Sequence, residues 1–254
     1  MVVFSNAKIN IGLNITEKRF DGFHNIESIF YPIDLKDVLE VVKSENGLQF
    51  KNTGIVVDSL PKDNLIIKAY NLIAKDYDIQ PVKIHLHKTI PIGAGLGGGS
   101  SNSVFMLKLL NNFFELNISD EILTNYARQL GSDCAFFVKN IPVFASEKGD
   151  VFSDINLDLS DYKIIVKNPN IFVSTQEAYS GIVPKNAELS LKDLITRPIS
   201  EWKNFIKNDF EKEIFKKYPK IKDLKDDFYK NGAIYASMSG SGSSVYGIFE
   251  KDRV

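Results

Sequence analysis

The stretch that decides the fold is Pro91-Ile92-Gly93-Ala94-Gly95-Leu96-Gly97-Gly98-Gly99-Ser100-Ser101. Glycine lets a backbone wrap closely around a polyanion, because it has no side chain and tolerates positive φ. The apolar run that follows is typical of a buried helix, whose first turn offers free N–H groups and the positive end of the helix dipole to phosphate. The stretch therefore predicts a phosphate-binding loop for ATP. Ser100 and Ser101 add hydroxyls that either donate to phosphate or reach a Mg²⁺ ion.

A glycine-rich hairpin or a flexible hinge is the structural alternative for residues 91–101. Neither explains why the glycines directly precede a rigid apolar helix. The stretch is not a Walker A loop, because no Gly-Lys-Ser/Thr follows it, and it lacks the strand, helix and acidic residue of a dinucleotide-binding fingerprint.

The residues before the loop predict strands and one helix. Strands are expected at 7–15, 38–42 and 82–87, and in the last of these His85 and His87 form the polar face. Asp63 is the expected N-cap of a helix with an apolar side at Leu65, Ile66, Ala69, Tyr70 and Ile73. A metal site ligated by the two histidines is not expected, since no further ligand is suitably spaced.

After the loop, residues 104–114 form an apolar helix, and Ser119 begins another that Gly131 ends in a left-handed conformation. A buried strand is expected at 162–166, and Ser174 with Glu177 fits a capping box. The later elements are a helical region at 189–229 broken by Pro198 and Pro219, then strands at 233–238 and 245–249 around a small-residue loop. This order favours an α+β fold, divided into domains 1–155 and 156–254.

Composition narrows the functional classes. The chain has 254 residues, 44% hydrophobic and 25% charged, with a net charge of −1. Without a basic stripe, nucleic-acid binding is not expected, and the lysines between 216 and 225 fit a solvated helix face. No apolar run is long enough for a membrane span, and the N-terminus does not resemble a signal peptide. The single cysteine, Cys134, fits a reducing compartment, so a cytoplasmic protein is expected.

Three segments together resemble the motifs of the GHMP kinases, which include galactose, homoserine, mevalonate and phosphomevalonate kinases. The segments are Asn6-Ala7-Lys8-Ile9-Asn10, the loop at 91–101, and Met238-Ser239-Gly240-Ser241-Gly242-Ser243-Ser244. The resemblance implies a two-domain α+β fold with the active site in the cleft between an N-terminal and a C-terminal domain. It also implies ATP as co-substrate, with Mg²⁺.

A fourth segment narrows the resemblance within that superfamily. Arg19-Phe20-Asp21-Gly22-Phe23-His24 is similar to the segment typical of kinases that phosphorylate 4-diphosphocytidyl-2-C-methyl-D-erythritol, as are Ala7-Lys8-Ile9-Asn10 and Gly131-Ser132-Asp133. The implied reaction is ATP-dependent phosphorylation of a hydroxyl of this CDP-linked polyol in non-mevalonate isoprenoid biosynthesis. The implied partner is this small molecule alone, without nucleic acid or membrane, for a monomer or weak homodimer.

The resemblance assigns catalytic roles to Asp133 and Lys8. From the residues alone, Asp133 reads as a capping or turn aspartate; with the resemblance it becomes the base for the acceptor hydroxyl. A Lys8–Asp133 pair would keep the carboxylate ionised, and Asn10 would hydrogen-bond the polyol. Cys134-Ala135 replaces the Val-Pro of many relatives, which we expect to alter packing only.

Further residues are assigned to the two substrates. Phe23 is the expected stacking platform for cytosine, although a loop phenylalanine can also be tucked into the core. His24 would bind the edge of the base and Tyr179 its other face. Ser239, Gly240 and Ser241 would form a second wall around the triphosphate or acceptor, unless that loop is a simple hairpin turn. Asn64 and Lys88 resemble positions on the adenine side of ATP.

Three competing interpretations stay open. The nearest is a GHMP kinase for another small alcohol, such as homoserine or a mevalonate derivative, against which Asp21-Gly22-Phe23-His24 argues. A non-catalytic member that binds nucleotide is the second, against which Lys8 and Asp133 argue. A nucleic-acid binder is the third, and the charge distribution disfavours it.

Overall fold

The computed structural model describes residues 1–57 and 60–251 and divides the chain into two compact units. The first unit comprises Met1–Ala7, Asp34–Ile92 and Gly97–Ile141; the second comprises Lys8–Ile33, Gly93–Leu96 and Pro142–Val254. Both are discontinuous because the long strands β1 (Val2–Lys18) and β2 (His24–Lys43) contribute to each. Helices and mainly antiparallel sheets occur in both units, which confirms the α+β class. No unit boundary falls at 155/156, and the division there stays a prediction.

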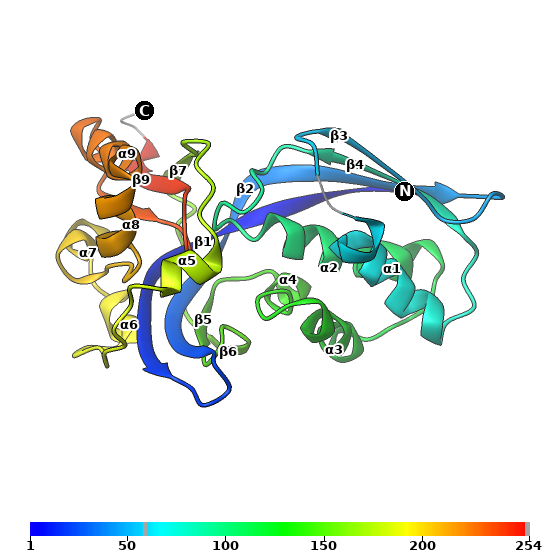
Figure 1. The fold of residues 1–254 in the computed structure, drawn as a ribbon, viewed down its shortest axis with the longest axis horizontal. Helices are drawn as coiled ribbons and strands as arrows, with labels where there is room; N and C mark the ends of the chain where they lie inside the picture. The colour runs from blue at the N-terminus through cyan, green and yellow to red at the C-terminus, as the bar shows by residue number, and fades with distance from the viewer. Residues whose placement is uncertain (58–59, 252–254) are drawn as a thin grey trace. The chain divides into compact units, whose positions relative to one another are not determined.

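The first unit is a sheet with helices on one face (Figure 1). The later half of β2 pairs antiparallel with β4 (Val82–Lys88), and β4 pairs parallel with β3 (Gln49–Gly54). The helices are α1 (Leu65–Asp76), α2 (Gly98–Phe113), α3 (Asp120–Leu130) and α4 (Phe136–Lys139), and a 3₁₀ turn, η1, spans Pro61–Asp63.

Strand β4 confirms the predicted alternation. Val82, Ile84 and Leu86 are buried, whereas His85 and His87 lie on the other face, where both rings contact the Thr53 hydroxyl, at 2.9 and 3.0 Å. The same alternation places the next residue, Lys88, on the buried face.

Three local predictions in the first unit need correction. The N-cap of α1 is Asn64, whose side chain accepts from the backbone N–H of Ile66 at 2.9 Å, and Asp63 lies in the preceding turn. Helix α2 begins at Gly98, inside the glycine stretch, rather than near residue 104. Gly131 ends α3 as predicted, but with φ 170° it is extended, because the chain straightens there instead of turning back.

The second unit contains two sets of strands. The first half of β2 pairs with β5 (Val143–Ser146), which pairs with β6 (Val151–Asp154). A separate three-stranded antiparallel sheet has the order β7 (Tyr162–Lys167), β9 (Val245–Glu250), β8 (Tyr235–Met238). The prediction of a buried strand at 162–166 is wrong, since β7 lies at the sheet edge and its side chains are half-buried or exposed.

The helices of the second unit are short. They are α5 (Thr175–Tyr179), α6 (Leu191–Leu194), α7 (Ile199–Phe205), α8 (Glu211–Lys217) and α9 (Pro219–Lys230). Ser174 caps α5 through the Glu177 N–H at 3.1 Å, and the breaks predicted at Pro198 and Pro219 are confirmed. The unit's core joins β1, α8, α9 and the three-stranded sheet, with Leu13, Ile214, Ile221, Phe228 and Met238 among its buried residues.

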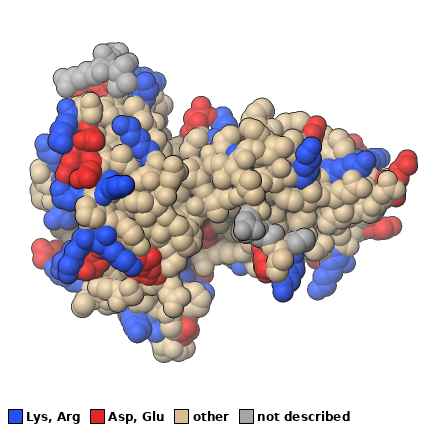
Figure 2. All heavy atoms as spheres, turned by 45° about the horizontal axis from the view of Figure 1, so that its top comes forward, with Lys and Arg blue, Asp and Glu red and all other residues tan. Residues whose placement is uncertain are grey.

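Charged side chains of both signs are interspersed on the surface drawn in Figure 2, over both units. Lys216, Lys217, Lys220 and Lys222 are exposed on α8 and α9, as predicted for a solvated helix face. Lys225 departs from that prediction, because it is half-buried and pairs with the buried Glu211 at 2.6 Å. Within residues 1–57 and 60–251, no helix is long and apolar enough to cross a bilayer.

Because Asn64 is the N-cap of α1 and Asp63 is not, substitutions at these two adjacent positions should differ in their effect on stability. Asn64→Ala removes the acceptor for the first turn of α1 and should lower the free energy of unfolding by about 1 kcal/mol. Asp63→Ala changes an exposed residue outside the helix and should cost only a few tenths of a kcal/mol. Urea unfolding of both variants measures the difference; equal losses would contradict the assignment of the cap.

Candidate active site

Lys8 lies on β1 in the second unit and is 5% exposed. Its ammonium contacts Asn10 Oδ1, the carbonyl oxygen of Gly95 at 3.4 Å and the face of Phe30 at 4.8 Å from the ring centroid. A buried cation is costly unless hydrogen-bonded, so these contacts fix the position of the ammonium. They also place it directly at the glycine stretch.

Asn10 connects Lys8 to the second small-residue loop. Its side-chain nitrogen donates to Ser28 Oγ at 2.9 Å, and its backbone N–H donates to Ser239 Oγ at 3.2 Å. The Tyr246 hydroxyl donates to its carbonyl at 2.9 Å. Asn10 is only 2% exposed, and its Oδ1 accepts from the Lys8 ammonium. Contact between Asn10 and a polyol stays a prediction.

The glycine stretch and the second small-residue loop meet at Gly95 and Ser239, both in the second unit. Ser239 Oγ donates to the Gly95 carbonyl at 2.8 Å. Gly95 has φ +76°, and a Cβ there would lie 1.9 Å from the Ser239 carbonyl oxygen. Only glycine fits this approach. The loop at 239–244 is therefore more than a hairpin turn, since it contacts the glycine stretch and the strand that carries Lys8.

Asn208 is a residue of this site that the sequence did not reveal. It is 2% exposed, and its side-chain nitrogen donates to the carbonyls of Met238 at 2.9 Å and Gly240 at 2.8 Å. These bonds hold the beginning of the second loop. Ser241 is half-buried, so it has a surface that a ligand can reach, whereas Ser239 is fully buried.

The remainder of the glycine stretch lies in the first unit and opens helix α2. Gly97, the N-cap, has φ +66°, and a Cβ on Gly98 would lie 2.8 Å from Ile90 Cγ2 and 2.9 Å from Lys88 Nζ. Surface access alternates along the stretch: Gly97, Gly99 and Ser100 have exposed surface, whereas Gly98 and Ser101 are buried. The predicted arrangement of a glycine loop at the N-terminus of a helix is confirmed.

Asp133, on the segment between α3 and α4, is brought next to the loop within the first unit. Ser100 Oγ donates to Asp133 Oδ1 at 2.7 Å, and the aspartate is half-buried. Behind it, Cys134 is fully buried and its Sγ lies 3.8 Å from Ser103 Oγ. Burial, with a smaller contribution from Asp133, raises the pKa of the Cys134 thiol to about 12, so it packs as a neutral side chain.

Asn64 and Lys88, predicted on the adenine side, both have structural partners. The side chain of Asn64 caps α1, and that residue is 8% exposed. Lys88 is 3% exposed and forms an ion pair with Asp37. ATP contact by either residue stays a prediction.

The hairpin between β1 and β2 in the second unit carries Phe23, which is 56% exposed. Core packing, the alternative weighed for this residue, is thereby excluded. The Arg19 N–H donates to the Phe23 carbonyl at 2.9 Å, which closes the hairpin, and Lys148 Nζ lies 5.4 Å from the centroid of the Phe23 ring. The ring is thus held on the surface of the hairpin.

His24 and Tyr179 are brought together. Their rings stack with centroids 4.5 Å apart and planes 18° from parallel, and the Tyr179 ring packs edge-on against Phe210. Burial, and secondarily the charge of Lys18, lowers the pKa of His24, which keeps the imidazole neutral at pH 7. A neutral imidazole has one donor and one acceptor nitrogen for the edge of a base.

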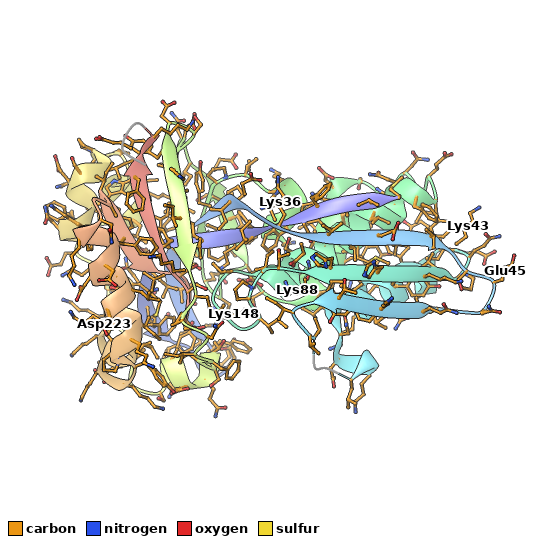
Figure 3. All side chains as sticks on the ribbon, turned by 90° about the horizontal axis from the view of Figure 1, so that it is seen from above. Lys36, Lys43, Glu45, Lys88, Lys148 and Asp223 are labelled. Atoms are coloured by element: carbon orange, nitrogen blue, oxygen red, sulfur yellow. The ribbon has the colours of Figure 1, made fainter. Side chains whose placement is uncertain are left out.

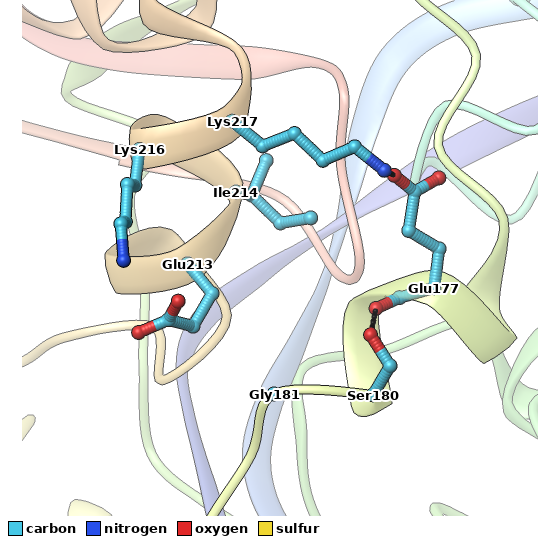
Figure 4. Close-up of a pocket in the computed structure, with 7 residues that line it drawn as sticks. All are labelled: Glu177, Ser180, Gly181, Glu213, Ile214, Lys216 and Lys217. Atoms are coloured by element: carbon cyan, nitrogen blue, oxygen red, sulfur yellow. Dashed lines mark hydrogen bonds and ion pairs between the residues drawn. The ribbon is translucent and has the colours of Figure 1, made fainter.

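Helix α5, which carries Tyr179, is held to the end of α8. Glu177 accepts from Lys217 and, at 2.8 Å, from the Tyr218 hydroxyl. The resulting interactions lower the pKa of the Glu177 carboxyl. A surface groove of about 380 Å³ lies beside this contact (Figure 4). Its lining consists of Glu177, Ser180, Gly181, Glu213, Ile214, Lys216 and Lys217, none of them a predicted site residue.

This combination of motifs defines a small-molecule kinase of the GHMP class. Residues 64–140 match the GHMP kinases N terminal domain, and residues 190–254 match the GHMP kinases C terminal domain. Kinases of this family use ATP as phosphate donor.

Two relatives identify the subfamily of the GHMP kinases to which the chain belongs. The chain is 51% identical over 255 residues to "4-diphosphocytidyl-2-C-methyl-D-erythritol kinase" of Bacteroides thetaiotaomicron, covering 99% of this chain and 93% of the relative. It is 35% identical to the protein of the same name from Chlorobium chlorochromatii, covering 97% and 87%. The chain belongs to the 4-diphosphocytidyl-2-C-methyl-D-erythritol kinase family of the GHMP kinases.

The fold of the chain is similar to that of solved GHMP kinase structures. A crystal structure of 4-(cytidine 5'-diphospho)-2C-methyl-D-erythritol kinase matches with a TM-score of 0.86 at 29% identity, covering 100% of this chain and 92% of that one. Methanococcus jannaschii mevalonate kinase matches with a TM-score of 0.73 at 16% identity, covering 100% and 92%. The second similarity concerns the fold alone.

The geometry of the loop predicts the effect of one substitution on ATP binding. Gly97→Val places a β-branched residue at φ +66° beside the first turn of α2, where it should obstruct phosphate and weaken ATP binding at least 10-fold. Gly47→Val is the matched control, because Gly47 has φ +76° and an added Cβ meets nothing within 4 Å. Titration calorimetry should give wild-type ATP affinity for the control only. Unchanged affinity in folded Gly97→Val would exclude the phosphate loop.

Proposed function

We propose that this protein transfers the γ-phosphoryl group of ATP to a hydroxyl of 4-diphosphocytidyl-2-C-methyl-D-erythritol, in non-mevalonate isoprenoid precursor biosynthesis. The observation that carries the proposal is 51% identity across 99% of the chain to a kinase named for this substrate. An ATP-dependent assay with this substrate tests it, with homoserine and mevalonate as the competing acceptors. Phosphorylation of either control in preference to the CDP-linked polyol would overturn it.

ATP is held by the glycine stretch at 91–101. Gly97 adopts the positive φ that precedes α2, and the N-terminus of α2 supplies free N–H groups and the positive end of its dipole. Gly95 lets the stretch contact the second small-residue loop at Ser239. Transfer to an alcohol requires mainly positioning and charge stabilisation, because the transition state is loose and carries its charge on the equatorial oxygens. Asn64 contributes on the adenine side.

Asp133 acts as the base and Lys8 as the cation of the transfer. The carboxylate of Asp133 accepts the proton of the acceptor hydroxyl as its oxygen attacks the γ-phosphorus, and the bond to the β-phosphate oxygen breaks to release ADP. Ser100 orients Asp133 through the 2.7 Å hydrogen bond. The ammonium of Lys8 offsets negative charge that develops during transfer.

Mg²⁺ fits this chain through Ser100 rather than Ser101. Ser100 Oγ is partly exposed beside the carboxylate of Asp133, whereas Ser101 is fully buried. When bound with ATP, the ion neutralises phosphate charge. The hydroxyl of Ser100, with the carboxylate of Asp133 beside it, would supply protein oxygens to hold it.

The cytidine end of the acceptor binds at the β1–β2 hairpin. Phe23 offers an exposed aromatic face for the base, and His24 offers neutral ring nitrogens to its edge. Tyr179 backs His24, while Ser241 and Asn10 serve the polyol or its phosphates. A small-molecule substrate, a cytoplasmic location and a monomer or weak homodimer complete the proposal.

A non-catalytic nucleotide-binding member is the alternative from a different class. Lys8 with its bonded Asn10, and Asp133 with its bonded Ser100, favour catalysis because both ionisable groups are oriented by neighbours. Nucleotide binding without turnover of any acceptor would favour the alternative.

Asp133→Asn should reduce kcat by about 100-fold or more and leave ATP affinity within about 3-fold, because it removes the proton acceptor but keeps the shape. Asp78→Asn, at an exposed position of the same unit, is the control and should retain wild-type kcat. Steady-state kinetics and ATP titration are the measurements. Wild-type turnover in Asp133→Asn would remove Asp133 from the mechanism.

Phe23→Ala should raise the KM for the CDP-linked substrate by about 5- to 150-fold, since base stacking on an aromatic ring is worth about 1–3 kcal/mol. The KM for ATP should not change. Phe20→Ala is the control, because Phe20 is fully exposed on the same hairpin. A lower melting midpoint with an unchanged acceptor KM would show instead that Phe23 only supports the fold.

A further inference from the structure

Asp37 is a fully buried carboxylate on β2, in the first unit, to which the mechanism assigns no role. Its Oδ1 accepts from the backbone N–H groups of Thr89 at 2.7 Å and Ile90 at 2.8 Å. Its Oδ2 accepts from Asn102 Nδ2 at 2.9 Å and from the ammonium of Lys88. The Thr89 hydroxyl adds a longer contact to Oδ1 at 3.5 Å. The carboxylate thus accepts hydrogen bonds from the end of a strand, from the turn after it and from helix α2.

The partners of Asp37 lie on both sides of the glycine stretch. Residues 88–90 lead directly into it, and Asn102 follows it on α2. Asn102 also donates to Ser5 Oγ at 2.7 Å, which ties the same turn of α2 to β1. Asp37 therefore fixes where the stretch begins and where it ends relative to one rigid strand.

Lys88 faces inward, below the first turn of α2. Its Nζ lies 2.9 Å from the position a Cβ on Gly98 would take, so any side chain there would collide with the ammonium. Figure 3 shows Lys88 among the strands at the end of β4, whereas Lys43 and Glu45 lie at the opposite end of this sheet. At 3% exposure, the ammonium has almost no surface to offer a ligand.

A buried ion pair is weak evidence for stability, because desolvation of the two charges offsets most of their attraction. Its other effect is geometric, since a buried carboxylate that accepts from several donors restricts its neighbours to one low-energy arrangement. For Asp37 those neighbours are the two ends of a loop whose task is to place backbone N–H groups around phosphate.

We propose that Asp37 is a positioning residue for ATP, which sets the spacing between the two ends of the phosphate loop, and that Lys88 acts through Asp37 and not by contact with the nucleotide. The proposal rests on the ATP-binding role proposed above for residues 91–101. In this proposal Lys88 does not make the ATP contact that the sequence had predicted, but affects ATP binding through its ion pair with Asp37.

Asn102→Leu tests the tie at the end of the loop, since it removes the donor and leaves the Asp37–Lys88 pair intact. Asp37→Asn/Lys88→Met tests the pair, and removes both charges so that neither is buried alone. Each should weaken ATP binding about 10-fold or more in titration calorimetry with Mg·ATP, well below the melting midpoint, because small misplacements of binding groups are costly. The KM for the acceptor should change less than about 3-fold.

Tyr126→Phe is the matched control. It removes a hydrogen bond to Asp76 between α3 and α1, in the same unit but away from the loop, and should lower the melting midpoint without altering ATP affinity. If the double variant does not fold, Asn102→Leu alone decides. Wild-type ATP affinity in folded Asn102→Leu overturns the positioning role. A wild-type protein that binds no ATP overturns the proposed function itself, and this inference with it.

Discussion

The close approach of Gly95 to Ser239 is the contact on which the position of Lys8 in the second unit depends. A Cβ on Gly95 would lie 1.9 Å from the Ser239 carbonyl, so the two loops can meet only because that side chain is absent. Ser239 Oγ then bridges the Gly95 carbonyl and the Asn10 N–H, and the side chain of Asn10 holds Lys8. Because Gly95 has no Cβ, the two loops can meet, and the hydrogen bonds through Ser239 and Asn10 then set the position of the Lys8 ammonium.

The part of the glycine stretch in the first unit is positioned by the buried Asp37 carboxylate rather than by close contact between two backbones. In the first unit, Asp37 binds residues before and after the stretch, and Lys88 neutralises it beneath Gly98. Burial lowers the pKa of Lys88, the cost of removing an ammonium from water, and the attraction of Asp37 opposes that shift. A loop whose glycines give it little stiffness of its own is thereby held at both ends by buried side chains.

Local signals in the sequence predicted the elements that need no distant partner. The glycine run predicted the loop and the helix after it, Ser174 predicted a cap, and Pro198 predicted a helix boundary. The alternation in β4 places Lys88 with Ile84 and Leu86 on the buried face, which favours a structural partner for its ammonium over contact with ATP. Asp37 and Asn208 could not be predicted, because no periodic pattern marks them and the partners that give them their roles are distant in sequence. Asp37 pairs with Lys88, 51 residues away, and the Asn208 side-chain nitrogen donates to Met238, 30 residues away. The N-cap was missed by one residue because Asp63 and Asn64 are both good caps.

The acceptor end shows why Phe23 and Tyr179 are unequal candidates for binding a base. His24 covers one face of the Tyr179 ring, and Phe210 packs perpendicular to that ring, so a base that used the covered face would first have to displace a stacked aromatic pair. Such a pair is worth about 0.5–1.5 kcal/mol, which would offset much of the roughly 1–3 kcal/mol gained by stacking the base. Phe23 is more than half exposed, and the ammonium of Lys148 lies 5.4 Å from its ring centroid. That lysine has a flexible stem and a carboxylate partner in Asp150 at 3.6 Å, so it can move aside for a base. These contacts favour Phe23 over Tyr179 as the stacking platform that we propose for the base, and they leave Tyr179 as a ring that packs against His24.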